Sequence, residues 1–212
     1  MIKVNEIFYS IQGESSYAGY PCVFIRLTGC NLRCSYCDTK YAYKNGNSMN
    51  IDRIVEIVER YECPLVEITG GEPLIQEETP VLVNSLLERG YKVLVETNGT
   101  KNINVLAKDA VCILDIKCPA SGESDKTDWD NIYRLGPGDE VKFVLSNIDD
   151  YEWAKEIIRK YKLTDRAVVH FSPLLGSLEP AEIAKRILND WLNVHLQVQL
   201  HKIIWPEENR GR

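Results

Sequence analysis

Strand-like and helix-like patterns of hydrophobic residues alternate along this chain. The strand-like segments are short, apolar and β-branched, whereas the helix-like segments repeat apolar residues at intervals of three and four. In residues 51–61, for example, Ile51, Ile54, Val55 and Val58 fall on one helical face. Strands are predicted at residues 22–28, 64–70, 91–97, 110–117, 139–146, 166–172 and 194–200. Helices are predicted at residues 51–61, 79–90, 128–136, 149–162 and 179–192.

This alternation predicts an α/β fold with parallel strands and crossover helices. An open doubly wound sheet and a partial (β/α) barrel both fit the pattern, and both bind ligands at the carboxyl ends of their strands. The segments that follow the predicted strands are rich in Gly, Cys, Asn and Ser: GCNLRCSYCDT, GGEPL, TNGT, KCPASG, SNIDD, SPLLGS and HKIIW. We therefore expect one domain over residues 1–212, with its active site along this edge.

Composition and charge argue against nucleic-acid-binding and membrane-spanning proteins. The 212 residues are 44% hydrophobic and 26% charged, as is ordinary for a globular enzyme, and the formal net charge is −6. This charge argues against a nucleic-acid surface, because phosphate binding favours a basic face. No apolar run approaches the roughly 18 residues of a membrane span, and residues 1–15 lack the apolar stretch of a signal peptide. We expect a cytoplasmic protein without nucleic-acid or membrane partners.

Seven cysteines are present, and three of them crowd into one loop. Cys30, Cys34 and Cys37 have C-x3-C-x2-C spacing, so their thiolates can converge on one metal centre. A [4Fe–4S] cluster held by three cysteines would leave one iron open. A redox dithiol would use only two of the three thiols. Structural zinc needs a fourth ligand, which would come from Cys63, Cys112 or Cys118. The loop alone leaves these interpretations open, whereas Cys22, Cys63 and Cys112 lie in apolar segments typical of buried cysteines.

A second motif, ITGGEPL at residues 68–74, favours one interpretation. Two glycines at a strand end let the backbone approach a ligand closely, and Glu72 beside them can accept from an ammonium group. With the three-cysteine loop on the preceding unit, this motif resembles the radical S-adenosylmethionine superfamily. The resemblance implies a [4Fe–4S] cluster on the three cysteines, S-adenosylmethionine on the open iron, and an external electron donor of the flavodoxin or ferredoxin type.

Further motifs narrow the resemblance to the 7-carboxy-7-deazaguanine synthase family. They run in order nearly from end to end: EIFYSIQGE, ITGGEPL, ETNGT, DIKCP, KFVLS and QLHKIIW. The resemblance implies an incomplete (β/α) barrel of about six parallel strands, a homodimer, and conversion of 6-carboxy-5,6,7,8-tetrahydropterin to 7-carboxy-7-deazaguanine with loss of ammonia. This reaction serves queuosine and deazapurine biosynthesis. A glycyl-radical-enzyme activase would share the cluster and GGEP elements but lack IQGE and the QLHKIIW tail, and a zinc-stabilised binding module is a non-enzymatic alternative.

The resemblance also implies residue roles toward the substrate and magnesium. Substrate contacts are expected from Ile11, Gln12, Glu14, Arg26, Thr69 and His201. The Glu14 carboxylate suits two parallel N–H bonds, and the guanidinium of Arg26 suits a carboxylate or the pterin edge, although a buried ion pair would also explain its mid-strand position. Thr39 is expected to bind Mg²⁺ through its hydroxyl, with a hydrogen bond inside its own loop as the alternative. A surface position is the alternative for His201, while His170 and His195 are expected to be structural.

The remaining roles concern the cofactor. Contacts to S-adenosylmethionine are expected from Tyr36, Gly70, Gly71, Glu72, Glu96, Asn98, Asp115 and Lys117. The side chains of Asp115 and Lys117 share one face of a strand, so the pair suits the cofactor carboxylate or ribose, with a structural salt bridge as the alternative. No side chain is assigned a catalytic role. Residues 206–212 are expected to be solvated, with closure of a few of them over the substrate as the alternative.

Overall fold

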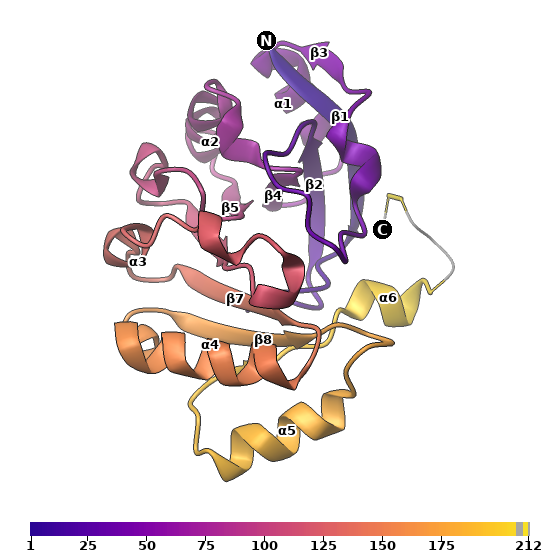
Figure 1. Ribbon diagram of the computed structural model, residues 1–212. Coiled ribbons are helices and arrows are strands. Elements are labelled where there is room, and N and C mark those ends of the chain that lie inside the picture. Colours follow the sequence, from indigo (N-terminus) through magenta and orange to yellow (C-terminus); the bar gives the residue numbers. More distant parts are fainter. Residues whose placement is uncertain (207–209, 212) are drawn as a thin grey trace.

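The computed structural model describes residues 1–206, 210 and 211. All its strands join one curved sheet in the order β3-β1-β2-β4-β5-β6-β7-β8-β9, and α1, α2 and α4 cover its outer face (Figure 1). The strands are β1 (Ile2–Ile11), β2 (Pro21–Leu27), β3 (Asn47–Met49), β4 (Leu65–Gly70), β5 (Lys92–Thr97), β6 (Val111–Asp115), β7 (Glu140–Leu145), β8 (Val168–Pro173) and β9 (His195–Leu196).

The helices are of two kinds, and all but the last, α6, lie between strands in the chain. The α-helices are α1 (Ile51–Glu59), α2 (Thr79–Leu87), α3 (Asn131–Arg134), α4 (Ile148–Tyr161), α5 (Pro180–Asn189) and α6 (Leu200–Ile204). The short 3-10 helices are η1 (Lys40–Tyr43), η2 (Pro73–Ile75), η3 (Ile103–Val105), η4 (Pro119–Ser121), η5 (Ser124–Lys126) and η6 (Leu163–Asp165). In the part of the chain described, no helix combines the length and apolar character needed to cross a membrane.

The predicted parallel architecture is confirmed. Every neighbouring pair from β2 to β9 is parallel. The strand order runs from β3 at one edge to β9 at the other without closing, so the sheet is an incomplete barrel. Parallel strands joined by helices end at the same edge, which brings the loops after β2, β4, β5, β6 and β7 together.

The two ends of the sheet differ from the prediction. β1 and β3 were not predicted, and they add an antiparallel extension beside β2. β9 has two residues in place of the seven expected over 194–200. Gln197 still donates its backbone N–H to Phe171 O of β8 at 2.9 Å, while its side-chain amide donates to Ser15 O at 3.1 Å, and the chain leaves the sheet after this residue. The next residues form α6, which lies at the cavity mouth.

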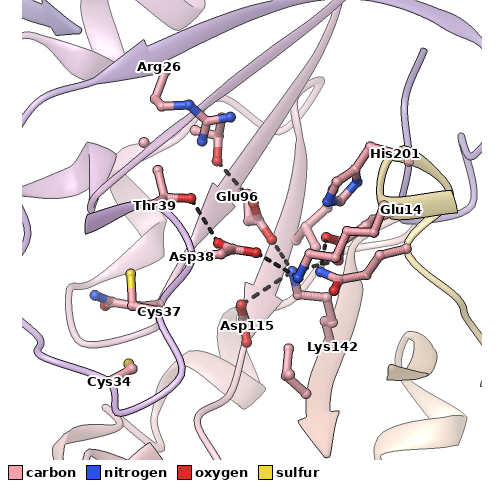
Figure 2. A pocket seen from close by; sticks show the side chains of 18 of the residues that line it. Glu14, Arg26, Cys34, Cys37, Asp38, Thr39, Glu96, Asp115, Lys142 and His201 are labelled. Atoms are coloured by element: carbon pink, nitrogen blue, oxygen red, sulfur yellow. Dashed lines mark hydrogen bonds and ion pairs between the residues drawn. The ribbon is translucent and has the colours of Figure 1, made fainter. Parts of the chain in front are cut away.

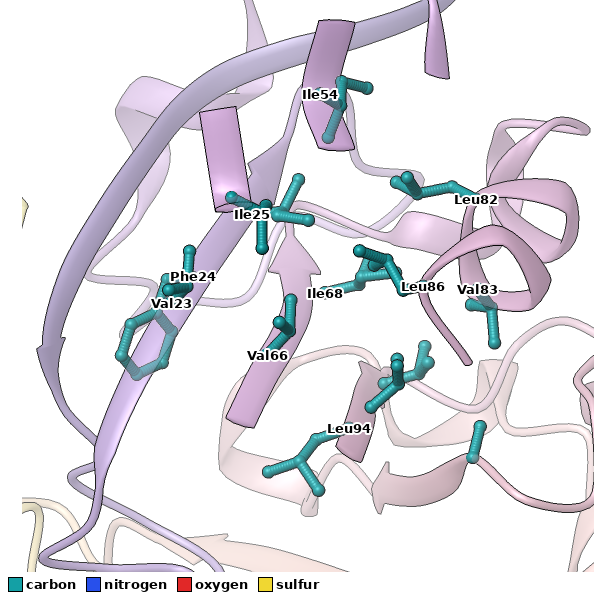
Figure 3. Close-up of a cluster of buried hydrophobic side chains, with 14 of the residues drawn as sticks. Val23, Phe24, Ile25, Ile54, Val66, Ile68, Leu82, Val83, Leu86 and Leu94 are labelled. Atoms are coloured by element: carbon teal, nitrogen blue, oxygen red, sulfur yellow. The ribbon is translucent and has the colours of Figure 1, made fainter. Parts of the chain in front are cut away.

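Apolar side chains pack between the sheet and the helices. On the N-terminal half, Ile25 and Ile68 project from β2 and β4 toward Ile54, Leu82 and other residues of α1 and α2 (Figure 3). A second cluster joins β6, β7 and β8 to α4 and α5. Each fully buried Leu or Ile contributes roughly 1.5 to 3 kcal/mol. Because side chains alternate along a strand, this packing turns the intervening residues toward the barrel interior.

Candidate active site

A cavity of about 560 Å³ opens at the carboxyl ends of the strands. Its size is typical of a small-molecule site. Of the residues expected to contact cluster, cofactor, metal or substrate, only Glu72 is absent from its wall. The others line it: Ile11, Gln12, Glu14, Arg26, Cys30, Cys34, Tyr36, Cys37, Thr39, Thr69, Gly70, Gly71, Glu96, Asn98, Asp115, Lys117 and His201. The fold therefore gathers motifs from across the chain into one site.

The three-cysteine loop follows β2 and is held against the segment after β6. Ser35 N donates to Ser121 O at 3.0 Å, and Arg33 N donates to Glu123 Oε1 at 2.6 Å. Leu32 is buried and anchors the loop from inside. Burial raises the pKa of the Cys34 thiol to about 11, so metal binding at this thiol would release a proton. By contrast, Cys22, Cys63 and Cys112 are buried away from this cavity, as predicted.

The arrangement of the thiols bears on which metal group they suit. Among residues 1–206, 210 and 211, no three His, Cys, Asp or Glu side chains converge closely enough to hold a single metal ion. Cys30, Cys34 and Cys37 nevertheless all face the same cavity. The three candidates for a fourth zinc ligand, Cys63, Cys112 and Cys118, are all buried and do not line the cavity. Three thiols around a shared space suit a multi-iron cluster better than tetrahedral zinc.

The Gly-Gly turn packs directly on the cysteine loop. Gly70 has φ +148°, and a Cβ there would lie 2.3 Å from Leu27 O. A Cβ on Gly71 would lie 1.9 Å from Gly29 O and 2.8 Å from Cys30 Cβ. Only glycine fits these contacts, since real Cβ atoms keep van der Waals distance. The turn thus leaves its backbone beside the cluster position, where an ammonium group can be bound by carbonyl oxygens.

Glu72, which was expected to contact S-adenosylmethionine, does not line the cavity. Its carboxylate is fully buried and accepts from Thr97 Oγ1 at 2.7 Å, Asn98 N at 2.6 Å and Leu74 N at 2.9 Å. Burial raises the pKa of this group above its usual value. The side chain therefore joins the Gly-Gly turn to the end of β5, and an ammonium group at the cavity would meet the turn's backbone instead.

Lys142, which the sequence analysis did not single out, is the central cation of the cavity floor. Its Nζ lies 2.9 Å from Glu14 Oε2 and 3.3 Å from Asp115 Oδ2, and it also contacts Glu96 Oε1 (Figure 2). The side chain is 6% exposed. The signal was available in the sequence, because a lysine inside the apolar strand EVKFVL needs partners.

Electrostatics fix the charge of this cluster. Burial opposes ionisation of Glu14, but Lys142 and His201 overcome it and lower its pKa to about 2. Burial likewise opposes ionisation of Asp115, while Lys117 and Lys142 together hold its pKa below the usual range. The predicted Asp115–Lys117 pair is present, with Nζ 2.7 Å from Oδ2. Both carboxylates are thus charged at neutral pH, each with a cation in contact.

Several buried polar atoms of the described chain lack a hydrogen-bond partner, and two of them belong to residues expected to contact the cofactor. These two are Asp115 Oδ1 and the Tyr36 hydroxyl, and both residues line the cavity. Such atoms cost free energy unless a ligand or water satisfies them. Asn98 is near as well, since its Nδ2 donates to Asn31 Oδ1 at 3.0 Å and lies 4.0 Å from Cys30 Sγ. These groups fit a polar ligand such as the ribose and amino-acid parts of S-adenosylmethionine.

Arg26 lies in another part of the cavity wall, together with Tyr41, and both side chains contact Glu6. Arg26 Nε lies 2.9 Å from Glu6 Oε1, which also accepts from Tyr41 Oη at 2.8 Å. The ion pair considered from the sequence is therefore present. Arg26 still lines the cavity, and its side chain is 14% exposed, so the guanidinium also faces the space where a ligand carboxylate would lie.

The end of the cysteine loop meets the C-terminal helix α6. Thr39 Oγ1 donates to Asp38 Oδ1 at 2.9 Å, and Lys202 Nζ lies 2.7 Å from Asp38 Oδ2 (Figure 2). Although burial opposes ionisation, Lys202 lowers the pKa of Asp38 to about 2. His201 borders Glu14 across the cavity mouth, and burial lowers its pKa. A hydroxyl and a charged carboxylate side by side are hard oxygen donors that fit Mg²⁺.

Outside the cavity, His170 is structural as expected, with Nε2 2.7 Å from Glu140 Oε2. The C-terminal residues expected to be solvated are only partly described. Pro206 lines the cavity and the Arg210 guanidinium lies 4.2 Å from the centre of the Tyr41 ring, whereas residues 207–209 and 212 lie outside the described residues.

Comparison with known proteins agrees with this geometry. Residues 24–115 match the radical SAM superfamily. A 7-carboxy-7-deazaguanine synthase from Koribacter versatilis is 43% identical and the alignment covers 99% of this chain and 100% of the relative. The chain belongs to the 7-carboxy-7-deazaguanine synthase family. Another member, from Chlorobaculum tepidum, is 42% identical, with 99% and 97% of the two chains covered.

The fold of this family member also matches a solved structure. The crystal structure of QueE from Escherichia coli aligns with a TM-score of 0.74 at 20% identity, covering 93% of each chain. The likeness confirms the incomplete barrel. Membership of a radical SAM family implies a [4Fe–4S] cluster and S-adenosylmethionine, and the three cavity thiols with the Gly-Gly turn fit both.

Proposed function

We propose that this chain converts 6-carboxy-5,6,7,8-tetrahydropterin to 7-carboxy-7-deazaguanine and ammonia. The observation that carries the proposal is full-length similarity to proteins of that name, 43% identical in the best-covered case. The cavity supports it, because its ordered motifs supply a place for a cluster, for S-adenosylmethionine and for a small polar substrate. The residue roles below are part of the proposal.

Cys30, Cys34 and Cys37 hold the cluster, and the backbone of Gly70 and Gly71 receives the amino group of S-adenosylmethionine. When bound, these groups supply the radical that removes a hydrogen atom from the substrate. The protein positions the reactants and excludes water. Glu72 keeps the Gly-Gly turn in place through Thr97 and the Asn98 backbone.

Glu14 binds the N–C–N edge of the pterin. Its two oxygens each accept one protein hydrogen bond, from Lys142 at 2.9 Å and from Gln199 at 2.8 Å. A carboxylate has about four acceptor positions, so two remain for parallel N–H groups of a ligand. Lys142 holds this carboxylate ionised and oriented, and His201 closes the cavity mouth over it. The Thr69 hydroxyl donates to Glu96 at 2.9 Å and orients that carboxylate toward the cofactor space.

The opposite side of the cavity receives the substrate carboxylate. Arg26 faces it, with Glu6 holding the guanidinium by one nitrogen. Thr39 and the Asp38 carboxylate beside it would hold Mg²⁺, which would supply positive charge to neutralise the substrate carboxylate. Ile11 and Gln12 place the start of the Glu14 loop against the ring.

Partners are proposed more broadly. The cluster requires an external electron donor of the flavodoxin or ferredoxin type, and we propose a homodimer from the family resemblance. All seven cysteines are unpaired, which fits a reducing compartment such as the cytoplasm. Reduction assays with each donor type test the electron donor, and light scattering of the purified protein tests the homodimer.

Turnover under anaerobic conditions tests the activity. The reconstituted protein, with reductant, S-adenosylmethionine, Mg²⁺ and the carboxypterin, should release ammonia and form the deazaguanine chromophore. The Cys34→Ala variant is the matched negative control, and Cys63→Ala, outside the cavity, should remain active. A protein with four irons and labile sulfide that forms neither product would contradict the proposal and leave the glycyl-radical-enzyme activase to be tested.

A further inference from the structure

Glu67 is a buried acid in the cavity that has no role in the function proposed so far. It lies in the middle of β4, where the register places it between Phe24 of β2 and Leu94 of β5. The residue is 5% exposed and lines the cavity below Thr69. A carboxyl group between two apolar neighbours is costly to bury in its charged form.

The hydrogen-bond partner of Glu67 is neutral. Gln12 Nε2 donates to Glu67 Oε2, and Gln12 Oε1 accepts from Glu14 N at 3.0 Å. The second bond fixes the orientation of the Gln12 amide, because the reversed amide would place its NH2 group against the Glu14 N–H. Among the described residues, no cation lies within ion-pair distance of Glu67.

The surrounding charges also favour the neutral form of Glu67. Burial has the largest effect, followed by the negative charge of Glu96 on β5, and Glu14 on the loop after β1 adds to it. Lys142 on β7 and the hydrogen bond from Gln12 act in the opposite direction, but Lys142 already contacts three other carboxylates. On β2, Arg26 is paired with Glu6. Together these groups raise the pKa of Glu67 to about 8.

Two glutamates joined through one glutamine thus differ in protonation. Glu14 is ionised and only accepts hydrogen bonds, whereas a neutral carboxyl can also donate one. The pyrimidinone ring of the proposed substrate offers both kinds of group side by side. Its 2-amino and N3–H groups are donors, and the ring carbonyl next to N3 is an acceptor.

We propose that Glu67 is a substrate-recognition residue whose neutral carboxyl donates a hydrogen bond to the pterin ring carbonyl. This carbonyl lies next to the N–H groups that donate hydrogen bonds to Glu14. This inference rests on the proposed function. It explains why an acid stands at this apolar position of β4, and it makes recognition depend on pH. Ionisation of Glu67 would remove the donor and place a negative charge against the carbonyl oxygen.

Two substitutions separate this role from a structural one. Glu67→Gln keeps a donor and an acceptor in nearly the same shape but cannot ionise, and Glu67→Leu removes both. Glu56→Gln, on the exposed face of α1, is the matched control. Binding of the tetrahydropterin to the reconstituted enzyme is measured by anaerobic equilibrium dialysis without reductant, so that no turnover occurs, from pH 6.5 to 9.5. KM and kcat are then measured with reductant.

The wild type should lose affinity about tenfold per pH unit above pH 8, because the neutral form becomes the minor species. Glu67→Gln should stay within about threefold of the wild type at pH 7 and lose this dependence, and Glu67→Leu should bind roughly tenfold more weakly at pH 7. KM should follow these changes more than kcat. An unchanged pH dependence in Glu67→Gln would overturn the inference even if Glu67→Leu does not fold. Wild-type turnover is scored separately, and its absence would refute the proposed function.

Discussion

Lys142 contacts three carboxylates at the floor of this cavity. Replacing it with methionine tests whether its charge holds these carboxylates ionised and in place. Methionine has a similar length but no charge, so Glu14, Glu96 and Asp115 would lose their shared cation. We expect Lys142→Met to destabilise the fold strongly at neutral pH and much less in acid. Activity should also be lost, because Glu14 would no longer be held ionised and oriented.

The magnitude follows from the contacts. At the distances to Glu14 and Asp115, 2.9 Å and 3.3 Å, the gross attraction is about 5 kcal/mol each for an effective dielectric constant near 20. Desolvation offsets much of this, and removing one partner from a buried ion pair typically costs roughly 3 to 5 kcal/mol. The pKa of Glu14 gives a similar figure, since its depression from 4.5 to about 2 corresponds to roughly 3 kcal/mol.

The pH dependence has a definite sign. A carboxyl group with a lowered pKa contributes stability above its unfolded pKa and loses it as the pH falls toward the folded value. In the variant, the pKa values of Glu14 and Asp115 would rise, so protonation near pH 5 relieves the unpaired charge. Urea unfolding at pH 7.5 and pH 5.0, followed by tryptophan fluorescence, measures the difference. Lys160→Met, an exposed lysine on α4, is the control and should unfold close to the wild type.

A loss of stability below about 1 kcal/mol at pH 7.5, or one that is equal at both pH values, would refute this reasoning. The first result would mean that Lys142 does not hold the three carboxylates in solution. The second would mean that the methionine acts through packing rather than charge.

Three further changes test other parts of the site. Gly71→Ala should lower the iron content of the reconstituted protein severalfold, because the new Cβ would overlap Gly29 O at 1.9 Å, whereas Gly136→Ala meets only an ordinary contact at 3.7 Å and should bind iron normally. Thr39→Ala should weaken the Mg²⁺ dependence of turnover, seen as a higher Mg²⁺ concentration at half-maximal rate, and an unchanged titration would exclude the hydroxyl as a ligand. Glu67→Gln should be more stable than the wild type at alkaline pH by up to about 5 kcal/mol, because the stability linked to the raised pKa of Glu67 is present below about pH 4.5 and lost as the pH rises through about 8. Equal unfolding midpoints at pH 9 would contradict this.

Much of the site was predictable because its signals are local. The cysteine spacing and the glycines after β4 belong to single loops, and parallel strands bring such loops to one edge. The predicted Asp115–Lys117 pair needed only the alternation of a strand. The strand β2 and the strands β4 to β8 were predictable for the same reason, since each has an apolar run of its own.

The rest depends on contacts between distant segments. β1 has a mixed burial pattern and is a strand because it pairs with β2 and β3. The direction of the Glu72 carboxylate follows from Thr97 and the Asn98 backbone on the next strand. The charge of Glu67 depends on side chains from the loop after β1 and from β5 and β7. These partners come from other strands and loops, so no local sequence pattern predicts the contacts.

The family resemblance also implies that S-adenosylmethionine is regenerated in each turnover, so the central claim is that this chain performs the proposed ring contraction with S-adenosylmethionine as a reusable cofactor. The most direct measurement is the ratio of deazaguanine product to S-adenosylmethionine consumed, with the cofactor present at a fraction of the carboxypterin concentration under anaerobic conditions. The account predicts many product molecules per S-adenosylmethionine and one ammonia per product. Consumption of S-adenosylmethionine to 5′-deoxyadenosine without deazaguanine or ammonia, by protein with an intact cluster, would contradict it.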